Sequence, residues 1–265
     1  MKNFYHNKTI LITGASSGIG KDLALFYSAF NTKLILLARR EDLLKQIQDE
    51  CQKNGSEVLI FAADVSDRKK MEAIASDVLN QWGFVDIVIA NAGVGGLNPA
   101  DHFSLDLNQK FVAINILGLA YTLVPFIDSM KQNKKGILVG ISSLAAFRGL
   151  PKAASYSSSK AAQGVFLESL RVDLKKYGIS VCSIHPGFIE TPMTDHDEFK
   201  MPFMVPVRKS SILIAKAIKR KKAVYLYPWP MRILTYINKK LPVCVYDYLV
   251  PRLSGQKQNT DSRTF

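Results

Sequence analysis

The sequence alternates between short apolar runs and longer segments with helical periodicity, and this alternation constrains the fold more than any other feature. Several short runs are apolar on successive residues, which is typical of parallel strands covered on both faces. The alternation predicts an α/β fold, a doubly wound parallel sheet of about seven strands with helices on both faces. The predicted strands are Thr9–Ile12, Leu34–Leu37, Val58–Phe61, Val85–Ile89, Ile137–Ile141, Ile179–Ile184 and Ala223–Tyr227. The predicted helices are Gly18–Phe30, Glu41–Lys53, Arg68–Gln81, Leu107–Met130, Ala154–Tyr177 and Lys209–Lys221.

The net charge of +13 is concentrated at one end of the chain. Residues 200–265 hold 14 of the 35 lysines and arginines but only two of the 22 acidic residues, which leaves +1 for residues 1–199. Because the excess belongs to one segment, the charge pattern does not support a diffuse surface for nucleic acid.

The first residues of the chain and its cysteine content predict the cellular compartment of the protein. The first residues lead from a few polar side chains into an apolar run too short for a signal peptide, and we expect no membrane-spanning stretch. The three cysteines are widely spaced and the four histidines lack metal-ligand spacing, so we predict no disulfide and no metal site. Each histidine, including His185, is expected to be structural or to lie at the surface. These features predict a cytoplasmic protein.

A glycine-rich turn follows the first strand. Its three glycines have the spacing G-x-x-x-G-x-G and stand between a predicted strand and a predicted helix. Such a turn lets the backbone approach a pyrophosphate, which the free N–H groups at the helix N-terminus then bind. The residues expected to contact the phosphates are Gly14, Ser16, Ser17, Gly18, Ile19 and Gly20.

Tyr156 and Lys160 are four residues apart in a predicted helix, so they face the same side about one turn apart. An ammonium about 5 Å from the phenol, at an effective dielectric of about 20, favours phenolate by about 3 kcal/mol, or about two pKa units. This spacing predicts a tyrosine that exchanges protons near neutral pH. The alternative is an ordinary surface tyrosine beside a lysine, and Ser143 upstream favours the catalytic interpretation.

In order along the chain, these motifs resemble the classical short-chain dehydrogenase/reductase family, from about Lys8 to about Tyr227. The resemblance rests on TGASSGIG at the glycine turn, on Asn91-Ala92-Gly93, and on a PG-x-x-x-T segment at Pro186, Gly187 and Thr191. Asn115, Ser143, Tyr156 and Lys160 fall where the family has its catalytic tetrad. The resemblance implies a Rossmann-like fold and an oxidoreductase that uses a nicotinamide cofactor.

The resemblance also implies roles for the four residues. Tyr156 donates and accepts the proton, and Lys160 lowers its pKa and binds the nicotinamide ribose. Ser143 polarises the substrate oxygen, and Asn115 holds a water that links Lys160 to solvent. Ser142 is the alternative to Ser143 as the residue that polarises the substrate oxygen, but the thirteen-residue interval to Tyr156 favours Ser143.

The cofactor preference follows from charge at the end of the second strand. NAD-selective relatives have an acid where this chain has Ala38, and here Arg39 and Arg40 follow instead. Arginine suits a 2′-phosphate because it binds bidentately and is always charged, so we predict NADP(H). Because Ser17 is not basic, the phosphate would be held from one side. The resemblance adds as cofactor contacts Asp64, Val65, Asn91, Ala92, Gly93, Tyr156, Lys160, Pro186, Gly187, Ile189 and Thr191.

The segment 186–222 resembles the family's substrate lid and the helix that follows it. Phenylalanine and methionine in this segment predict a bulky apolar substrate, lipid-like or steroid-like. A lid that packs these side chains on its own domain is the alternative. The predicted substrate contacts are Ser143, Tyr156, Phe188, Met193, Phe199 and Phe203.

Together these features predict an NADP(H)-dependent enzyme that interconverts a carbonyl and a secondary alcohol. The alternative is a non-catalytic, NADP-binding regulatory protein, which the intact tetrad disfavours. We expect residues 1–253 to form one domain with a helical extension over 229–253, and 254–265 to be disordered.

Two kinds of partner are expected besides the substrate. The segments around Asn115 and over Ala154–Tyr177 resemble the family's dimerisation helices, which implies a homodimer or homotetramer. Residues 209–253 combine apolar and aromatic side chains at helical spacing with lysine and arginine, which predicts peripheral docking on an anionic membrane. The alternative is that these helices cap the substrate pocket or pack on a partner subunit.

Overall fold

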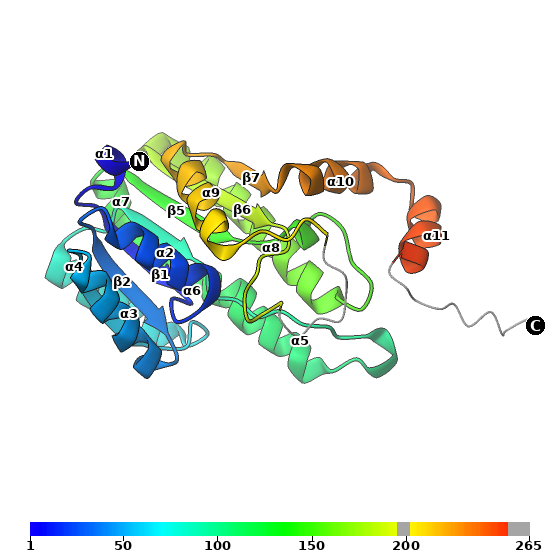
Figure 1. Cartoon of the computed structure of the whole chain (residues 1–265), viewed down its shortest axis with the longest axis horizontal. Helices are drawn as coiled ribbons and strands as arrows, with labels where there is room; N and C mark the ends of the chain where they lie inside the picture. Colours follow the sequence, from blue (N-terminus) through cyan, green and yellow to red (C-terminus); the bar gives the residue numbers. More distant parts are fainter. Residues whose placement is uncertain (195–201, 254–265) are drawn as a thin grey trace, which may run out of the picture.

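A computed structural model describes residues 1–194 and 202–253. All seven strands are parallel and lie in the order β3-β2-β1-β4-β5-β6-β7. This sheet confirms the predicted doubly wound α/β fold (Figure 1). The strands are β1 (Thr9–Thr13), β2 (Lys33–Ala38), β3 (Glu57–Ala62), β4 (Ile87–Ala90), β5 (Gly136–Ile141), β6 (Ile179–Pro186) and β7 (Val224–Tyr227).

Helices cover both faces of the sheet because successive strand residues point to opposite sides. On one face Ile10, Ile12 and Leu36 join a core with α2, α3 and α9. On the other face Leu11 and Ile35 join a core with α4, α6 and α8. The helix bounds are α2 (Gly18–Ser28), α3 (Glu41–Lys53), α4 (Arg68–Trp82), α6 (Gly118–Leu123), α8 (Ala154–Leu174) and α9 (Val207–Lys219).

The long helical segment predicted over Leu107–Met130 is interrupted in the structure. It comprises α5 (Leu105–Phe111), the π-helix η2 (Val112–Leu117), α6, the 3₁₀-helix η3 (Val124–Phe126) and α7 (Ile127–Gln132). Pro125 lies in η3, where it cannot supply a helical N–H. Asn115 lies in the π-helical turn, a feature often found at functional sites.

This same run corrects the expectation that no stretch could span a membrane. Leu105–Gln132 is 28 residues long and contains an 18-residue window with a mean hydropathy of 1.8, so it is long and apolar enough to span a membrane by length and composition alone. Its side chains Leu119, Leu123 and Met130 are buried in the core beside the sheet. The apolar composition of this run therefore contributes to the core.

Two helices follow β7 and extend beyond the carboxyl ends of the strands (Figure 1). They are α10 (Trp229–Lys240) and α11 (Val243–Leu253). The Arg148 guanidinium holds their junction, because its Nη1 donates to the carbonyls of Asn238 and Leu241 at 2.8 and 2.7 Å. The same guanidinium lies 4.0 Å from the ring centroid of Tyr246 in α11. These contacts join the end of the chain to the loop after β5.

Candidate active site

The glycine turn packs against the loop after β4, at the point where the strand order reverses. Thr13 Oγ1 accepts hydrogen bonds from the backbone N–H groups of Asn91 and Ala92, both at 3.1 Å. Asn91 Nδ2 donates to the Thr13 carbonyl at 2.9 Å. A Cβ on Gly14 would come within 2.9 Å of Ala92 Cα, so the two loops require glycine at this contact. Asn91 therefore holds the glycine turn in place.

The N-terminus of α2 opens toward the cavity. Among the described residues, the N-cap Ser17 makes no side-chain capping bond, and the first turn of α2 contains no acid. Its N–H groups and positive dipole end thus remain suited to a phosphate. Thr191 lies against this turn, because a Cβ on Gly18 would meet Thr191 Cγ2 at 3.3 Å. This cradle fits the pyrophosphate of a dinucleotide.

The two arginines after β2 take different partners. Arg40 Nη2 donates to Ser16 Oγ at 3.1 Å, across the glycine turn. Arg39 Nη1 lies 3.9 Å from Asp64 Oδ2, and its side chain is 65% exposed. Burial tends to raise the pKa of Asp64, but hydrogen bonds from Ser66 and the charge of Arg39 bring the pKa below its usual value. Arg39, Arg40 and Asp64 therefore present two guanidiniums and one ionised carboxylate to the part of the cavity beside the ends of β2 and β3.

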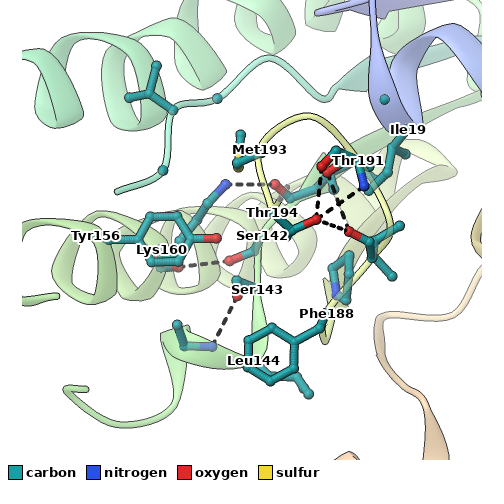
Figure 2. Close-up of a pocket in the computed structure, with 18 of the residues that line it drawn as sticks. Ile19, Ser142, Ser143, Leu144, Tyr156, Lys160, Phe188, Thr191, Met193 and Thr194 are labelled. Atoms are coloured by element: carbon teal, nitrogen blue, oxygen red, sulfur yellow. Dashed lines mark hydrogen bonds between the residues drawn. The ribbon is translucent and has the colours of Figure 1, made fainter. Parts of the chain in front are cut away.

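Ser143, Tyr156 and Lys160 line the same cavity as the glycine turn. Figure 2 shows Tyr156 and Lys160 on α8, with the Tyr156 hydroxyl pointing toward the serines at the end of β5. The ring of Tyr156 meets the edge of the buried Phe111 ring, with centroids 6.1 Å apart. Lys160 Nζ donates to the Ile141 carbonyl at 3.1 Å. The three predicted side chains are thus brought together at the carboxyl end of the sheet.

The hydrogen bonds of Ser142 and Ser143 indicate different roles for the two hydroxyls. Ser142 Oγ donates to the Lys160 carbonyl at 3.0 Å, which ties this hydroxyl to the backbone of α8. Ser143 is the N-cap of η4 (Leu144–Ala146), and its Oγ accepts from the Ala145 N–H at 3.2 Å. An accepting hydroxyl keeps its proton free to donate. The geometry therefore favours Ser143 as the residue that meets a substrate oxygen.

Burial controls the ionisation of Tyr156 and Lys160. Burial raises the pKa of Tyr156 above its usual value, and the hydrogen bond with the Ser143 side chain only partly opposes this. Burial also lowers the pKa of Lys160 to about 8. These directions correct the sequence-based expectation that the lysine brings the tyrosine pKa toward neutrality. The reason is that desolvation favours the neutral form of both groups, and spacing along a helix does not reveal it.

Asn115 lies near Lys160, and its side chain is held by the loop after β4 and by α8. Its side chain accepts from the Val94 N–H at 2.9 Å, and donates to the Val94 carbonyl at 3.0 Å and to Ser159 Oγ at 2.9 Å. The Asn115 side chain is buried, and both it and the Lys160 ammonium lie close to Gly93: a Cβ there would lie 3.2 Å from Asn115 Oδ1 and 3.4 Å from Lys160 Nζ. The amide thus braces the loop after β4.

The cavity has a volume of about 770 Å³ and runs from the glycine turn to α10 and α11. Of the four predicted lid contacts, Phe188 and Met193 line it. Phe203 is 53% exposed and is not among the described residues that line the cavity, so its contact with the substrate stays a prediction. Phe199 lies outside the described residues.

The cavity is also lined by the remaining predicted cofactor positions, which are Gly14, Ser16, Ser17, Gly18, Ile19, Val65, Ala92, Pro186, Gly187, Ile189 and Thr191. Gly20 is absent from that lining within the described chain, because it packs against the Gly14 carbonyl.

One wall of the cavity was not among the predicted substrate contacts. It comes from the last two helices and includes Met231, Leu234, Thr235, Ile237, Asn238, Leu241, Leu249 and Val250. The available signal was the apolar helical spacing of residues 229–253, which the sequence also allowed as a cap over the pocket. The structure supports that alternative for the inner side of α10.

Comparison with known proteins agrees with this geometry. The family described as short chain dehydrogenase matches residues 8–201. An uncharacterized oxidoreductase of Myxococcus xanthus is 37% identical over 250 residues, covering 93% of this chain and 97% of that protein. A fatty acyl-CoA reductase of Acinetobacter baylyi is 27% identical over 234 residues, covering 86% and 79%. The solved structure of an alcohol dehydrogenase from the archaeon Thermococcus sibiricus, complexed with 5-hydroxy-NADP, is 28% identical with a TM-score of 0.76, covering 84% and 95%.

The family match begins just before β1 and includes the glycine turn together with Ser143, Tyr156 and Lys160. Enzymes of this family use NAD or NADP as cofactor. The cradle at the start of α2 fits the phosphates of either. The chain therefore belongs to the short-chain dehydrogenase family of oxidoreductases.

Proposed function

We propose that the protein is an NADP(H)-dependent oxidoreductase that interconverts a carbonyl and a secondary alcohol. The observation that carries this proposal is the shared cavity, which joins the phosphate cradle of α2 to Ser143, Tyr156 and Lys160. When bound, the nicotinamide cofactor supplies the hydride that adds to the carbonyl carbon, or accepts it in the reverse direction. A screen for NADPH consumption over apolar ketones and small hydrophilic carbonyls tests the proposal.

The side chains divide the remaining chemistry. In the direction of reduction, the Ser143 hydroxyl donates to the substrate oxygen and polarises the carbonyl. The Tyr156 phenol then transfers its proton to that oxygen, and the raised pKa keeps this proton in place at neutral pH. The Lys160 ammonium stabilises the phenolate left behind, with its ring centroid 5.8 Å from Nζ. Oxidation of the alcohol reverses these steps.

The preference for NADP(H) rests on the side chains after β2. Arg39 is largely exposed at the edge of the cavity, and Arg40 reaches Ser16 on the glycine turn. Two guanidiniums near one point favour an additional phosphate, since each can form charge-assisted, bidentate hydrogen bonds. The complex of the Thermococcus alcohol dehydrogenase with 5-hydroxy-NADP is in line with this assignment.

The proposed substrate is bulky and apolar. Phe188, Met193 and Leu234 line the cavity, and large apolar surfaces of this kind favour apolar ligands. The relative in Acinetobacter acts, by its name, on fatty acyl groups, which supports a lipid-like substrate here. Turnover of small hydrophilic carbonyls alone would contradict the assignment.

We also propose a homodimer or homotetramer. Val165 and Val172 on α8 are 66% and 64% exposed, and Leu117 and Val124 on the neighbouring helical run are also exposed. Exposed apolar side chains on two adjacent helices favour association with a second copy. Sedimentation at micromolar concentration tests this, and a monomer would contradict it.

Peripheral docking on an anionic membrane surface is proposed for the outer side of α10. Its pocket-lining residues occupy one side of the helix, while Trp229, Ile233 and Tyr236 lie at helical spacing on the other and are 69%, 46% and 49% exposed. Arg232, Lys239 and Lys240 flank these side chains, in the part of the sequence that carries most of the net charge. Aromatic side chains with adjacent cations suit the interface of an anionic leaflet. This location would place the proposed cytoplasmic enzyme beside a lipid-like substrate.

Co-sedimentation of the full chain with phosphatidylserine vesicles tests this docking. We expect binding to anionic vesicles but little to phosphatidylcholine vesicles, and a clear loss of binding in the double variant Trp229→Ser, Ile233→Ser. Leu105→Ser removes a leucine of comparable exposure from α5 and should bind as the wild type does. Self-association without vesicle binding at low salt would assign the surface to a second copy and contradict membrane docking.

A further inference from the structure

The side chain of Gln163 lies between two residues of the candidate active site. Gln163 is in α8, three residues after Lys160, and only 1% of it is exposed. Its Oε1 accepts a hydrogen bond from Lys160 Nζ at 3.2 Å, and its Nε2 donates to the backbone carbonyl of Asn115 at 2.6 Å. One buried amide therefore bridges the ammonium on α8 and a carbonyl in the π-helix η2.

The chemistry of the two neighbours fixes the orientation of this amide. An ammonium only donates and a carbonyl only accepts, so the amide must turn its oxygen to Lys160 and its nitrogen to Asn115. The reverse orientation would place donors against donors and oxygen against oxygen. Unpaired buried polar groups cost about 1–3 kcal/mol each, so one orientation is strongly favoured. The bridge is thus a fixed dipole with its negative end on the ammonium.

The other contacts of Lys160 and Asn115 show what the bridge does. The Asn115 side chain is occupied by Val94 and by Ser159 of α8, and its backbone carbonyl makes a second contact with α8 through Gln163. Lys160 Nζ has the Ile141 carbonyl as its second acceptor. An ammonium has three donor hydrogens, and these two acceptors leave the third for the cavity that Lys160 lines.

We propose that Gln163 is a positioning residue that holds the Lys160 ammonium charged and directed into the cavity. The family resemblance implies a water, held by Asn115, that links Lys160 to solvent; here the Gln163 amide joins the Lys160 ammonium directly to the Asn115 backbone carbonyl. The inference rests on the proposed function, because that function gives the ammonium its role. Within residues 1–194 and 202–253, Tyr156 on the same helix and His185 on β6 are the titratable groups near Lys160. Burial favours the neutral form of both.

Two variants of Gln163 with opposite expected effects test the proposal. Gln163→Leu keeps the side-chain volume but removes the oxygen that accepts from Lys160, so the neutral Lys160 amine is favoured. The basic limb of the pH profile of kcat/KM should therefore shift to lower pH by about one unit. Gln163→Glu adds a carboxylate beside the ammonium, so the limb should move up. If Gln163 had only a structural role, both variants would have a lower rate but the basic limb of the kcat/KM profile would stay at the same pH. That result would overturn the proposal.

A readout without turnover separates this inference from the proposed function. The Lys160 side chain can be titrated directly by NMR on isotope-labelled lysine Cε, with the signal assigned by Lys160→Arg, and the same opposite shifts are expected. If the wild type consumes no NADPH but the shifts occur, the function fails and the role of Gln163 stands. If the leucine variant does not fold, the upward shift in Gln163→Glu decides, and its absence overturns the proposal.

Thr122→Val is the matched control. Thr122 is also buried, and its Oγ1 donates to the Gly118 carbonyl at 2.7 Å within α6. The variant therefore removes a buried hydrogen bond from the same helical layer without changing the partners of Lys160. Its pH profile and its lysine titration should match those of the wild type.

Discussion

His185 on β6 donates a hydrogen bond from Nδ1 to the backbone carbonyl of Ser143 at 3.0 Å. A carbonyl only accepts, so Nδ1 carries the proton and Nε2 accepts from Ser183 Oγ at 2.8 Å. The ring is 3% exposed and packs on Phe147, with centroids 4.9 Å apart. His185 therefore supports the backbone of Ser143, the serine that faces the cavity. This role is more specific than the one predicted from the sequence.

This neutral histidine should make stability depend on pH. Burial lowers the pKa of His185 to about 4, while an unfolded histidine titrates near 6.5. Between these values the unfolded chain binds a proton that the folded chain does not, so the free energy of unfolding falls as the pH decreases through this window. Between about pH 7 and about pH 5 the expected loss from this residue is about 2 kcal/mol.

Denaturant unfolding at the two pH values measures this loss. His185→Gln should show less of it, because glutamine does not titrate. His102→Gln replaces an exposed histidine and should keep the wild-type dependence. Identical pH dependence in wild type and His185→Gln would contradict the burial of a neutral ring.

Arg39→Ala should raise KM for NADPH by about tenfold or more and leave KM for NADH nearly unchanged. The physical reason is that a hydrogen bond between two charged groups contributes about 1.5–3 kcal/mol, and only NADPH offers the 2′-phosphate. Lys45→Ala removes an exposed cation further along α3, whose partner is Glu41, and serves as the control. Equal changes for both cofactors would exclude Arg39 as the phosphate ligand.

The inner side of α10 should set the size of the substrate. Leu234→Trp narrows the cavity beside α10, so turnover of bulky apolar ketones should fall at least tenfold while that of small ketones changes little. Val243→Trp places the same side chain at an exposed position at the start of α11 and should be neutral. Steady-state kinetics over a graded series of ketones makes this comparison. A parallel loss for small and bulky ketones would argue against this wall.

Local patterns predicted the features that depend on local physics. The apolar runs gave the strands because parallel strands buried on both faces need such runs, and the glycine spacing marked the turn between β1 and α2. Thr13 and Asn91 are far apart in sequence, but their positions at adjacent strand ends follow from the sheet topology. The resemblance then located Ser143, Tyr156 and Lys160.

Features that depend on long-range packing were missed or left open. Arg148 is 90 and 93 residues away from the carbonyls that it binds at the end of α10, so spacing could not decide whether the last helices form a wall of the cavity. The raised pKa of Tyr156 depends on desolvation, which a helical i,i+4 pair does not encode. Gln163 was overlooked because a glutamine in a helix is usually an exposed, neutral residue.

NADPH consumption by Tyr156→Phe, compared with the wild type on one bulky apolar ketone, tests the central claim most directly. The aromatic ring at position 156 remains against Phe111, so the variant should still bind NADPH, which fluorescence measures. Because the proton donor is lost, we expect kcat to fall by about 10²–10⁴-fold, the range that general acid catalysis supplies. Turnover of Tyr156→Phe at the wild-type rate would contradict the account.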